Sequence, residues 1–287
     1  MKNKILLGLM SLSSSILLAE DHIELGIGFI SAKDNLSYIK NKKNISLSKS
    51  PTEQEIAVPV LSFEYNGFFV GVGDNTQGIG YRHDFDAFLV EASYNSYEVF
   101  ENPYLVNQNR KLVDAQELAL SISKTYSEFI EFSLSYKNIE IDDKVAKDAQ
   151  QSANEIGFDA NALLLSLSKN VYMGLGYNFT YHDSKRESNT HHKNVISLFT
   201  FIELASDYTL TAEVGYERYI FNSKNSYFNK KRNEEGMSIG GQLMVDNLFN
   251  NKNSYLKMAL FYGKRDSNIN FFDTEYTGGS LSYGYKF

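Results

Sequence analysis

The last ten residues, Gly278 to Phe287, read GGSLSYGYKF and carry the clearest signal of the fold. Leu281, Tyr283, Tyr285 and Phe287 are apolar or aromatic at every second position, and small or polar residues and one lysine stand between them. A period of two predicts a β-strand with one apolar and one polar face.

This strand finishes flush with the chain end on an aromatic residue, and in that it resembles the closing strand of bacterial outer-membrane β-barrels. The resemblance implies that Leu281, Tyr283, Tyr285 and Phe287 form the signal by which the outer-membrane assembly machinery recognises its clients. The alternative is the half-buried last strand of a soluble sandwich.

The start of the chain predicts export. Lys2 and Lys4 precede an apolar run from Ile5 to Leu18, and Ala19 offers a small residue before the acidic Glu20. This order is typical of a secretory signal peptide, whereas an anchor helix would need about twenty apolar residues. We expect residues 1–19 to be a cleaved signal peptide and residues 20–287 to form one barrel domain in the outer membrane of a Gram-negative bacterium.

Composition favours long paired strands and excludes several other classes. The chain has 20 Tyr, 20 Phe and only 3 Pro, which suits β-structure. It has no Cys, so disulfides and cysteine metal sites are excluded. Its net charge is −7, and loss of Lys2 and Lys4 makes it more acidic still, so we expect no nucleic-acid partner. No stretch after residue 20 is long and apolar enough for a spanning helix.

Alternating segments along the chain predict fourteen antiparallel strands in an up-and-down transmembrane barrel. The Asn66-Gly67 pair is a strong hairpin signal. The following pair, between Phe68 and His83, is short, and twelve strands remain if it is a loop excursion. Both counts are even, as in single-chain bacterial barrels. Polar segments predict long loops at residues 31–55, 100–116, 142–155, 183–193, 221–235 and 265–273.

Loop lengths predict the orientation. Turns after the even strands are short, whereas loops after the odd strands are long and charged. Outer-membrane barrels place their short turns in the periplasm. We therefore expect both termini to lie in the periplasm.

Two segments resemble a proteobacterial family catalogued as a domain of unknown function, number 2860. They are Asn102-Pro103-Tyr104-Leu105, before a strand that starts at Glu117, and residues 263–273, which contain the stretch DSNINFFD. The resemblance covers most of the mature chain. It implies an outer-membrane barrel, and it implies no activity, substrate or catalytic residue.

Charged side chains of the polar rows predict the lining of the lumen. The inward acids are Glu24, Glu64, Glu91, Glu117, Glu131, Asp159, Glu203, Glu213, Glu217 and Asp246, and the inward bases are Arg82, Lys137, Lys257, Arg265 and Lys286. Such charges either line a water-filled path or fill a plugged core. Eight strands already fill their interior with side chains, so fourteen leave room for water. An excess of acid favours the passage of cations.

Other candidate sites are weak. His182 and Asp183 are adjacent, so in a strand they point to opposite faces and make a poor catalytic dyad. His191-His192 falls in a predicted loop and lacks the third ligand of a metal site. Asp266, Asn268, Asn270 and Asp273 alternate as calcium ligands do, but turn residues that bond backbone explain them as well. We expect no enzyme and no cofactor.

Basic clusters in the predicted external loops are candidate contacts for lipopolysaccharide phosphates, or plain solvated surface. They are Lys40, Lys42, Lys43 and Lys49, Lys185 and Arg186, and Lys230, Lys231 and Arg232. The sequence as a whole predicts a monomeric, porin-like channel for small hydrophilic solutes with a mild cation preference. The alternative is a non-conducting surface barrel whose long loops bind a partner.

Overall fold

The computed structural model describes residues 21–34, 37–40, 43–46, 53–73, 76–86, 88–100, 112–127, 130–142, 151–225 and 228–287. The predicted signal peptide, residues 1–19, lies outside the described residues, as does the segment 102–105 of the family resemblance. Within the described ranges, no helix has both the length and the apolar character needed to cross a membrane.

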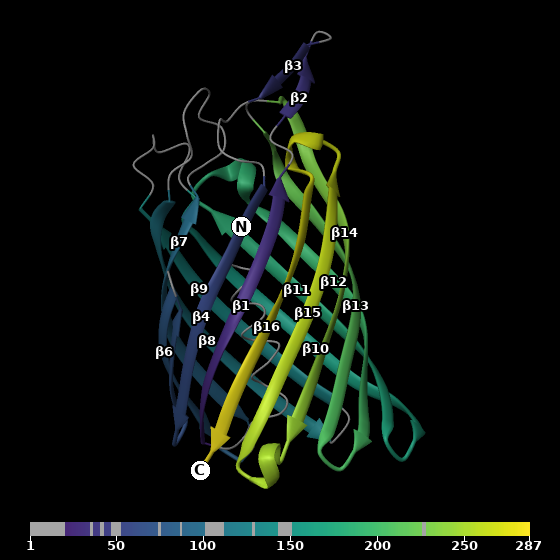
Figure 1. Ribbon diagram of the computed structural model, residues 1–287. Coiled ribbons are helices and arrows are strands. Elements are labelled where there is room, and N and C mark those ends of the chain that lie inside the picture. The colour runs from purple at the N-terminus through teal and green to yellow at the C-terminus, as the bar shows by residue number, and fades with distance from the viewer. Residues whose placement is uncertain are drawn as a thin grey trace.

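Fourteen antiparallel strands close into a barrel (Figure 1). They are β1 (His22–Asp34), β4 (Glu53–Tyr65), β5 (Phe68–Gly73), β6 (Thr76–Asp84), β7 (Leu89–Phe100), β8 (Leu112–Ser127), β9 (Ile130–Ile141), β10 (Ala153–Ser168), β11 (Val171–Ser184), β12 (His191–Ala205), β13 (Tyr208–Asn225), β14 (Lys230–Asp246), β15 (Ser254–Ser267) and β16 (Thr274–Lys286). The strands β2 (Ser37–Lys40) and β3 (Lys43–Ser46) form a separate hairpin, and three short 3₁₀ helices, η2 (Glu187–Asn189), η3 (Leu248–Asn250) and η4 (Asn270–Phe272), lie between strands.

Each barrel strand pairs with its sequence neighbours in the wall, and β1 pairs with β16 to close it. The all-β barrel of fourteen strands is therefore confirmed. The alternative of twelve is wrong, because β5 and β6 pair with each other and with β4 and β7. The predicted Asn66-Gly67 turn joins β4 to β5 with both residues at positive φ, which Asn and Gly adopt most readily.

One end of the barrel, the short-turn end, carries the C-terminus and tight connections such as residues 66–67 and 169–170 (Figure 1). The opposite, long-loop end carries the wider connections and the β2–β3 hairpin, where β2 contacts η4. The structure fixes these two ends relative to each other, and the assignment of the short-turn end to the periplasm stays a prediction.

Apolar side chains cover the outer face of the barrel. Leu25 and Leu260 are 65% and 66% exposed, and the intervening residues of the same strands point inward and are less exposed. Exposure of large apolar residues on this scale fits a surface that contacts lipid. Toward the long-loop end, the hydroxyls of Tyr136, Tyr177 and Tyr262 donate to Asn154, Asn194 and Glu275, which marks the polar border of this belt.

Aromatic rings on the inner face lie against glycines of the neighbouring strand. A Cβ added to Gly284 would fall 2.0 Å from Cζ of Tyr255, and one added to Gly174 or Gly278 would fall 2.3 or 2.4 Å from Cζ of Phe199 or Phe261. Glycine permits this approach because it has no side chain. The rings therefore lie along the wall rather than across the lumen.

Several strands extend beyond their predicted ends at the long-loop end. Residues 221–225, 230–235 and 265–267 were predicted as loop and belong to β13, β14 and β15. His191 and His192 were also predicted in a loop and are the first residues of β12. These segments rise above the apolar belt, where neither face contacts lipid, so their sequence does not alternate in polarity.

Candidate functional site: the charged lumen wall

Near the short-turn end, the inward charges form close pairs. Lys257 Nζ lies 2.7 Å from Glu24 Oε2, which also accepts a hydrogen bond from the hydroxyl of Tyr255. Lys286 Nζ lies 3.3 Å from Asp246 Oδ1. Both lysines were predicted to line the lumen, and each lies on the inner row beside a carboxylate of the adjoining wall.

Arg82 of β6 joins carboxylates of β4 and β7. Its Nε lies 3.2 Å from Glu64 Oε1 and 3.9 Å from Glu91 Oε2, and its guanidinium sits over the ring of Phe69. Farther from the short-turn end, Lys137 pairs with the buried Glu117 at 3.3 Å. Arg82 and Glu91 therefore face the same side of the wall, as the alternation predicts.

Four inward carboxylates have no cationic partner within the part of the chain that the structure describes. They are Glu131, Asp159, Glu203 and Glu213. Asp159 accepts hydrogen bonds from Ser133 and Asn178, and Glu203 borders a surface hollow of about 340 Å³ at the short-turn end. Glu131, Glu213 and Asp159 are partly exposed on the inner face, and Glu203 is exposed. All four lie on β9 to β13, so one side of the lumen carries uncompensated negative charge.

Glu217 differs from Glu213, although both were predicted as lumen-lining residues of β13. Glu217 is buried, lies 3.2 Å from Lys193 Nζ and accepts a hydrogen bond from the hydroxyl of Tyr219. Lys193 was not predicted, because it fell in an assumed loop. Lys193 is spaced by two from Val195, Ser197 and Phe199, and this spacing could have placed it on the inward face of β12.

A second cluster that the sequence did not predict lies closer to the long-loop end, on the inner face of β13 to β15. Arg232 is stacked between the rings of Phe221 and Phe272, at 3.6 and 4.1 Å from the two centroids. Glu234, which is 2% exposed, forms two salt bridges: its Oε1 lies 3.1 Å from Arg232 Nε, and its Oε2 lies 3.0 Å from Arg265 Nε. The prediction that Arg232 belongs to a solvated basic loop cluster is wrong, because the guanidinium is buried in this aromatic and ionic packing.

The cluster holds the connection between β15 and β16, which contains η4. Phe271 and Phe272 are buried there and pack edge-to-face with each other. The Asn268 amide donates to Lys231 O, and the Ser267 N–H donates to Asp273. Burial raises the pKa of Asp273, although the Ser267 hydrogen bond opposes the shift. These Asx side chains bond backbone groups, and the described residues include no group of three or more His, Asp or Glu that fits a metal.

We expect Arg232→Ala to release the β15–β16 connection, because Glu234 then keeps one cation and Phe272 loses its stacked partner. The free energy of unfolding in detergent should fall by about 3 kcal/mol, and proteolysis of residues 268–273 should accelerate. Arg232→Lys should recover only part of the loss, because an ammonium does not stack as a planar guanidinium does. Arg218→Ala is the matched control. Arg218 pairs with Glu235 at 3.5 Å on the exposed outer face, so stability should change little, and an equal loss there would contradict the account.

His182 and His191 lie near this cluster. His182 Nδ1 is 2.7 Å from Glu155 Oε1, and its ring is 4.8 Å from that of His191, which stacks on Phe221. Asp183 lies in the other row of β11, as expected for adjacent strand residues. His182 and Asp183 therefore do not come together as a catalytic dyad.

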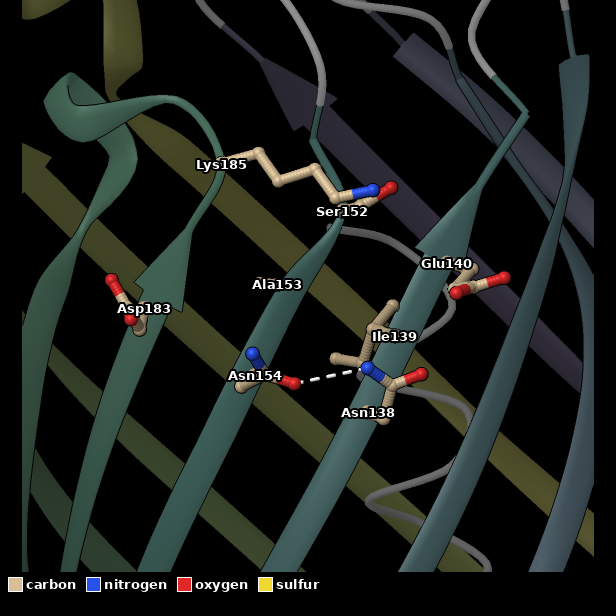
Figure 2. A pocket seen from close by; sticks show the side chains of 8 residues that line it. All are labelled: Asn138, Ile139, Glu140, Ser152, Ala153, Asn154, Asp183 and Lys185. Carbon is tan, nitrogen blue, oxygen red and sulfur yellow. Dashed lines mark hydrogen bonds between the residues drawn. The ribbon is translucent and has the colours of Figure 1, made fainter.

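A small cavity lies between the long-loop ends of β9, β10 and β11 (Figure 2). Its volume is about 50 Å³, and the side chains of Asn138 and Asn154 point toward each other beside it, with Nδ2 2.9 Å from Oδ1. A water molecule occupies about 30 Å³ of liquid volume. The cavity therefore has room for ordered water.

A family model described as "Protein of unknown function (DUF2860)" matches residues 20–286. No curated protein matches the sequence.

Solved structures with a similar fold include outer-membrane channels and a transporter. An outer membrane channel from Pseudomonas putida F1 aligns with a TM-score of 0.53 at 9% identity, over 96% of this chain and 98% of the channel. The Pseudomonas putida toluene transporter TodX aligns with a TM-score of 0.51 at 10% identity, over 94% and 90% of the chains. The CymD monoaromatic hydrocarbon channel aligns with a TM-score of 0.50 at 12% identity, over 93% and 88%. At these identities the likeness shows the fold alone, which is that of outer-membrane barrels.

Proposed function

The chain belongs to the family described as protein of unknown function (DUF2860), and from its lumen wall we propose that it is a passive outer-membrane pore for small hydrophilic solutes that favours cations. Fourteen strands enclose a lumen wider than the eight-stranded barrels that side chains fill. The inner rings that lie against glycines narrow this space little.

The charge balance of the wall carries the cation preference. Seven cations on the inward rows of the described strands lie within 3.3 Å of a carboxylate. They are Arg82, Lys137, Lys193, Arg232, Lys257, Arg265 and Lys286. Glu131, Asp159, Glu203 and Glu213 are left without such a partner among the described residues. Fixed negative charge in a water-filled passage attracts cations and repels anions.

Planar-bilayer recording of the purified protein tests this proposal. We expect stepwise conductance that persists without any energy source. Conductance steps support the pore, whereas silence at all voltages would favour the runner-up, a non-conducting barrel whose loops bind a partner.

We also propose that the protein is no enzyme and that it works as a monomer. Its exposed basic loop residues would contact the phosphates of lipopolysaccharide.

We propose that Phe287 serves assembly rather than stability. Its ring is 54% exposed and stacks on Phe63 and Tyr65 at centroid distances of 6.1 and 6.2 Å. Phe287→Ala should lower the amount of barrel in the outer membrane several-fold in cells, while the unfolding free energy of refolded protein falls by only about 1 kcal/mol.

The control is Phe85→Ala, an exposed ring in the connection between β6 and β7 that stacks on Phe88. Immunoblots of outer-membrane fractions should show normal levels for this variant. Equal levels of all three proteins would remove the assembly role of Phe287.

A further inference from the structure

Glu213 lies on the inner wall in a row that also holds two phenylalanines. In the strand register Glu213 lies opposite Phe199 of β12 on one side and opposite Gly240 of β14 on the other. Gly240 in turn lies opposite Phe261 of β15. These four residues form one row across four adjacent strands.

The two phenylalanine rings lean away from Glu213. The Phe199 ring lies over Gly174 of β11, and the Phe261 ring lies over Gly278 of β16. Both rings are partly exposed on the inner face. The row therefore has an aromatic surface on each side. The rings lie over β11 and β16, two and three strands away from Glu213 on β13, so a small solute held at Glu213 contacts one ring at a time.

The wall at Gly240, between Glu213 and Phe261, is not covered by a side chain. A Cβ added to Gly240 would meet no atom closer than 3.6 Å, in contrast with the glycines under the rings. Glu213 is partly exposed beside this part of the wall and has no cationic partner among the described residues. Ser238, which is next in the inward row of β14, places its hydroxyl over Gly215 of β13, the glycine two residues from Glu213.

We propose that Glu213, Phe199 and Phe261 form a binding subsite in the lumen for organic ammonium ions that carry an apolar substituent. The carboxylate attracts the ammonium group, and a phenylalanine ring receives the substituent and adds cation–π attraction. An inorganic cation gains from the carboxylate alone, and a neutral aromatic solute gains from the rings alone. The subsite thus rests on the proposed pore and names the class of solute that it retains.

Isothermal titration of the purified full-length barrel in detergent tests the subsite without any need for conduction. Benzyltrimethylammonium is the probe, and benzyl alcohol and potassium are its neutral and inorganic comparisons. We expect saturable binding of the probe that is about tenfold weaker in Glu213→Gln, a loss equivalent to about 1.4 kcal/mol. Phe199→Leu should also weaken binding, and Phe261→Leu serves the same purpose if the first variant folds poorly.

Glu131→Gln is the matched control, because Glu131 is an uncompensated carboxylate that lies opposite Asn161 and Thr125 and has no phenylalanine beside it in that row. It should leave probe binding unchanged. Absence of saturable binding, equal binding of benzyl alcohol, or an equal loss in Glu131→Gln would overturn the subsite. A cation-favouring pore that does not bind the probe refutes the subsite alone, whereas binding by a silent barrel refutes the pore and keeps the subsite.

Discussion

Gly284→Ala is expected to lower the free energy of unfolding of the barrel by about 3 kcal/mol, which is large for a substitution that changes no charge. The added Cβ would lie 2.0 Å from Cζ and 2.2 Å from the hydroxyl oxygen of Tyr255. The Tyr255 ring is fully buried and its hydroxyl donates to Glu24, so the ring has no free space into which to move. Either β15 and β16 separate locally or the Tyr255–Glu24–Lys257 cluster breaks.

Gly71→Ala is the matched control for this effect. Gly71 also lies on an inward row, but a Cβ built there has no atom within 4 Å, so alanine fits without a clash. Because alanine has less conformational entropy than glycine in the unfolded chain, the free energy of unfolding should stay equal or rise slightly. Urea titrations of the refolded barrels in lipid vesicles measure both variants. A Gly284→Ala/Tyr255→Ala double variant should lose less stability than the sum of its single variants. Equal stability of Gly284→Ala and Gly71→Ala would contradict the packing argument.

Neutralising the four uncompensated carboxylates together is expected to abolish the cation preference of the pore. The variant combines Glu131→Gln, Asp159→Asn, Glu203→Gln and Glu213→Gln, and it leaves every described ion pair of the lumen in place. The permeability ratio of potassium to chloride should fall to about one, because the remaining inward charges balance locally.

The control for that variant removes one neutral pair. Lys137→Gln with Glu117→Gln deletes an ion pair of 3.3 Å and keeps the net charge of the lumen, so the permeability ratio should not move. If the control shifts the ratio as much as the fourfold variant does, then the uncompensated carboxylates do not set selectivity.

Lipid contact explains why the strands were predictable. The outer row must be apolar wherever it meets lipid, so period-two alternation marks these segments in the sequence. Leu281, Tyr283 and Phe287 show it at the C-terminus, and β5 was predicted with its observed bounds, Phe68–Gly73. The same reason explains the failures, because the upper parts of β13 and β14 rise above the belt and lose the pattern while their backbone pairing continues.

The ion pairs could not be predicted from the same pattern. Alternation assigns a side chain to a face, but register decides which acid meets which base. Glu213 and Glu217 are equivalent in the sequence of β13, yet only Glu217 has Lys193 within reach. The register that separates them depends on long-range pairing of β12 with β13 and on a bulge near Glu203.

The most direct test of the account is the reversal potential of single channels in a bilayer with a potassium chloride gradient. We expect steps whose reversal potential has the sign of a cation-favouring pore and moves toward zero in the fourfold carboxylate variant. A silent barrel, or a wild-type channel that favours chloride, would contradict it.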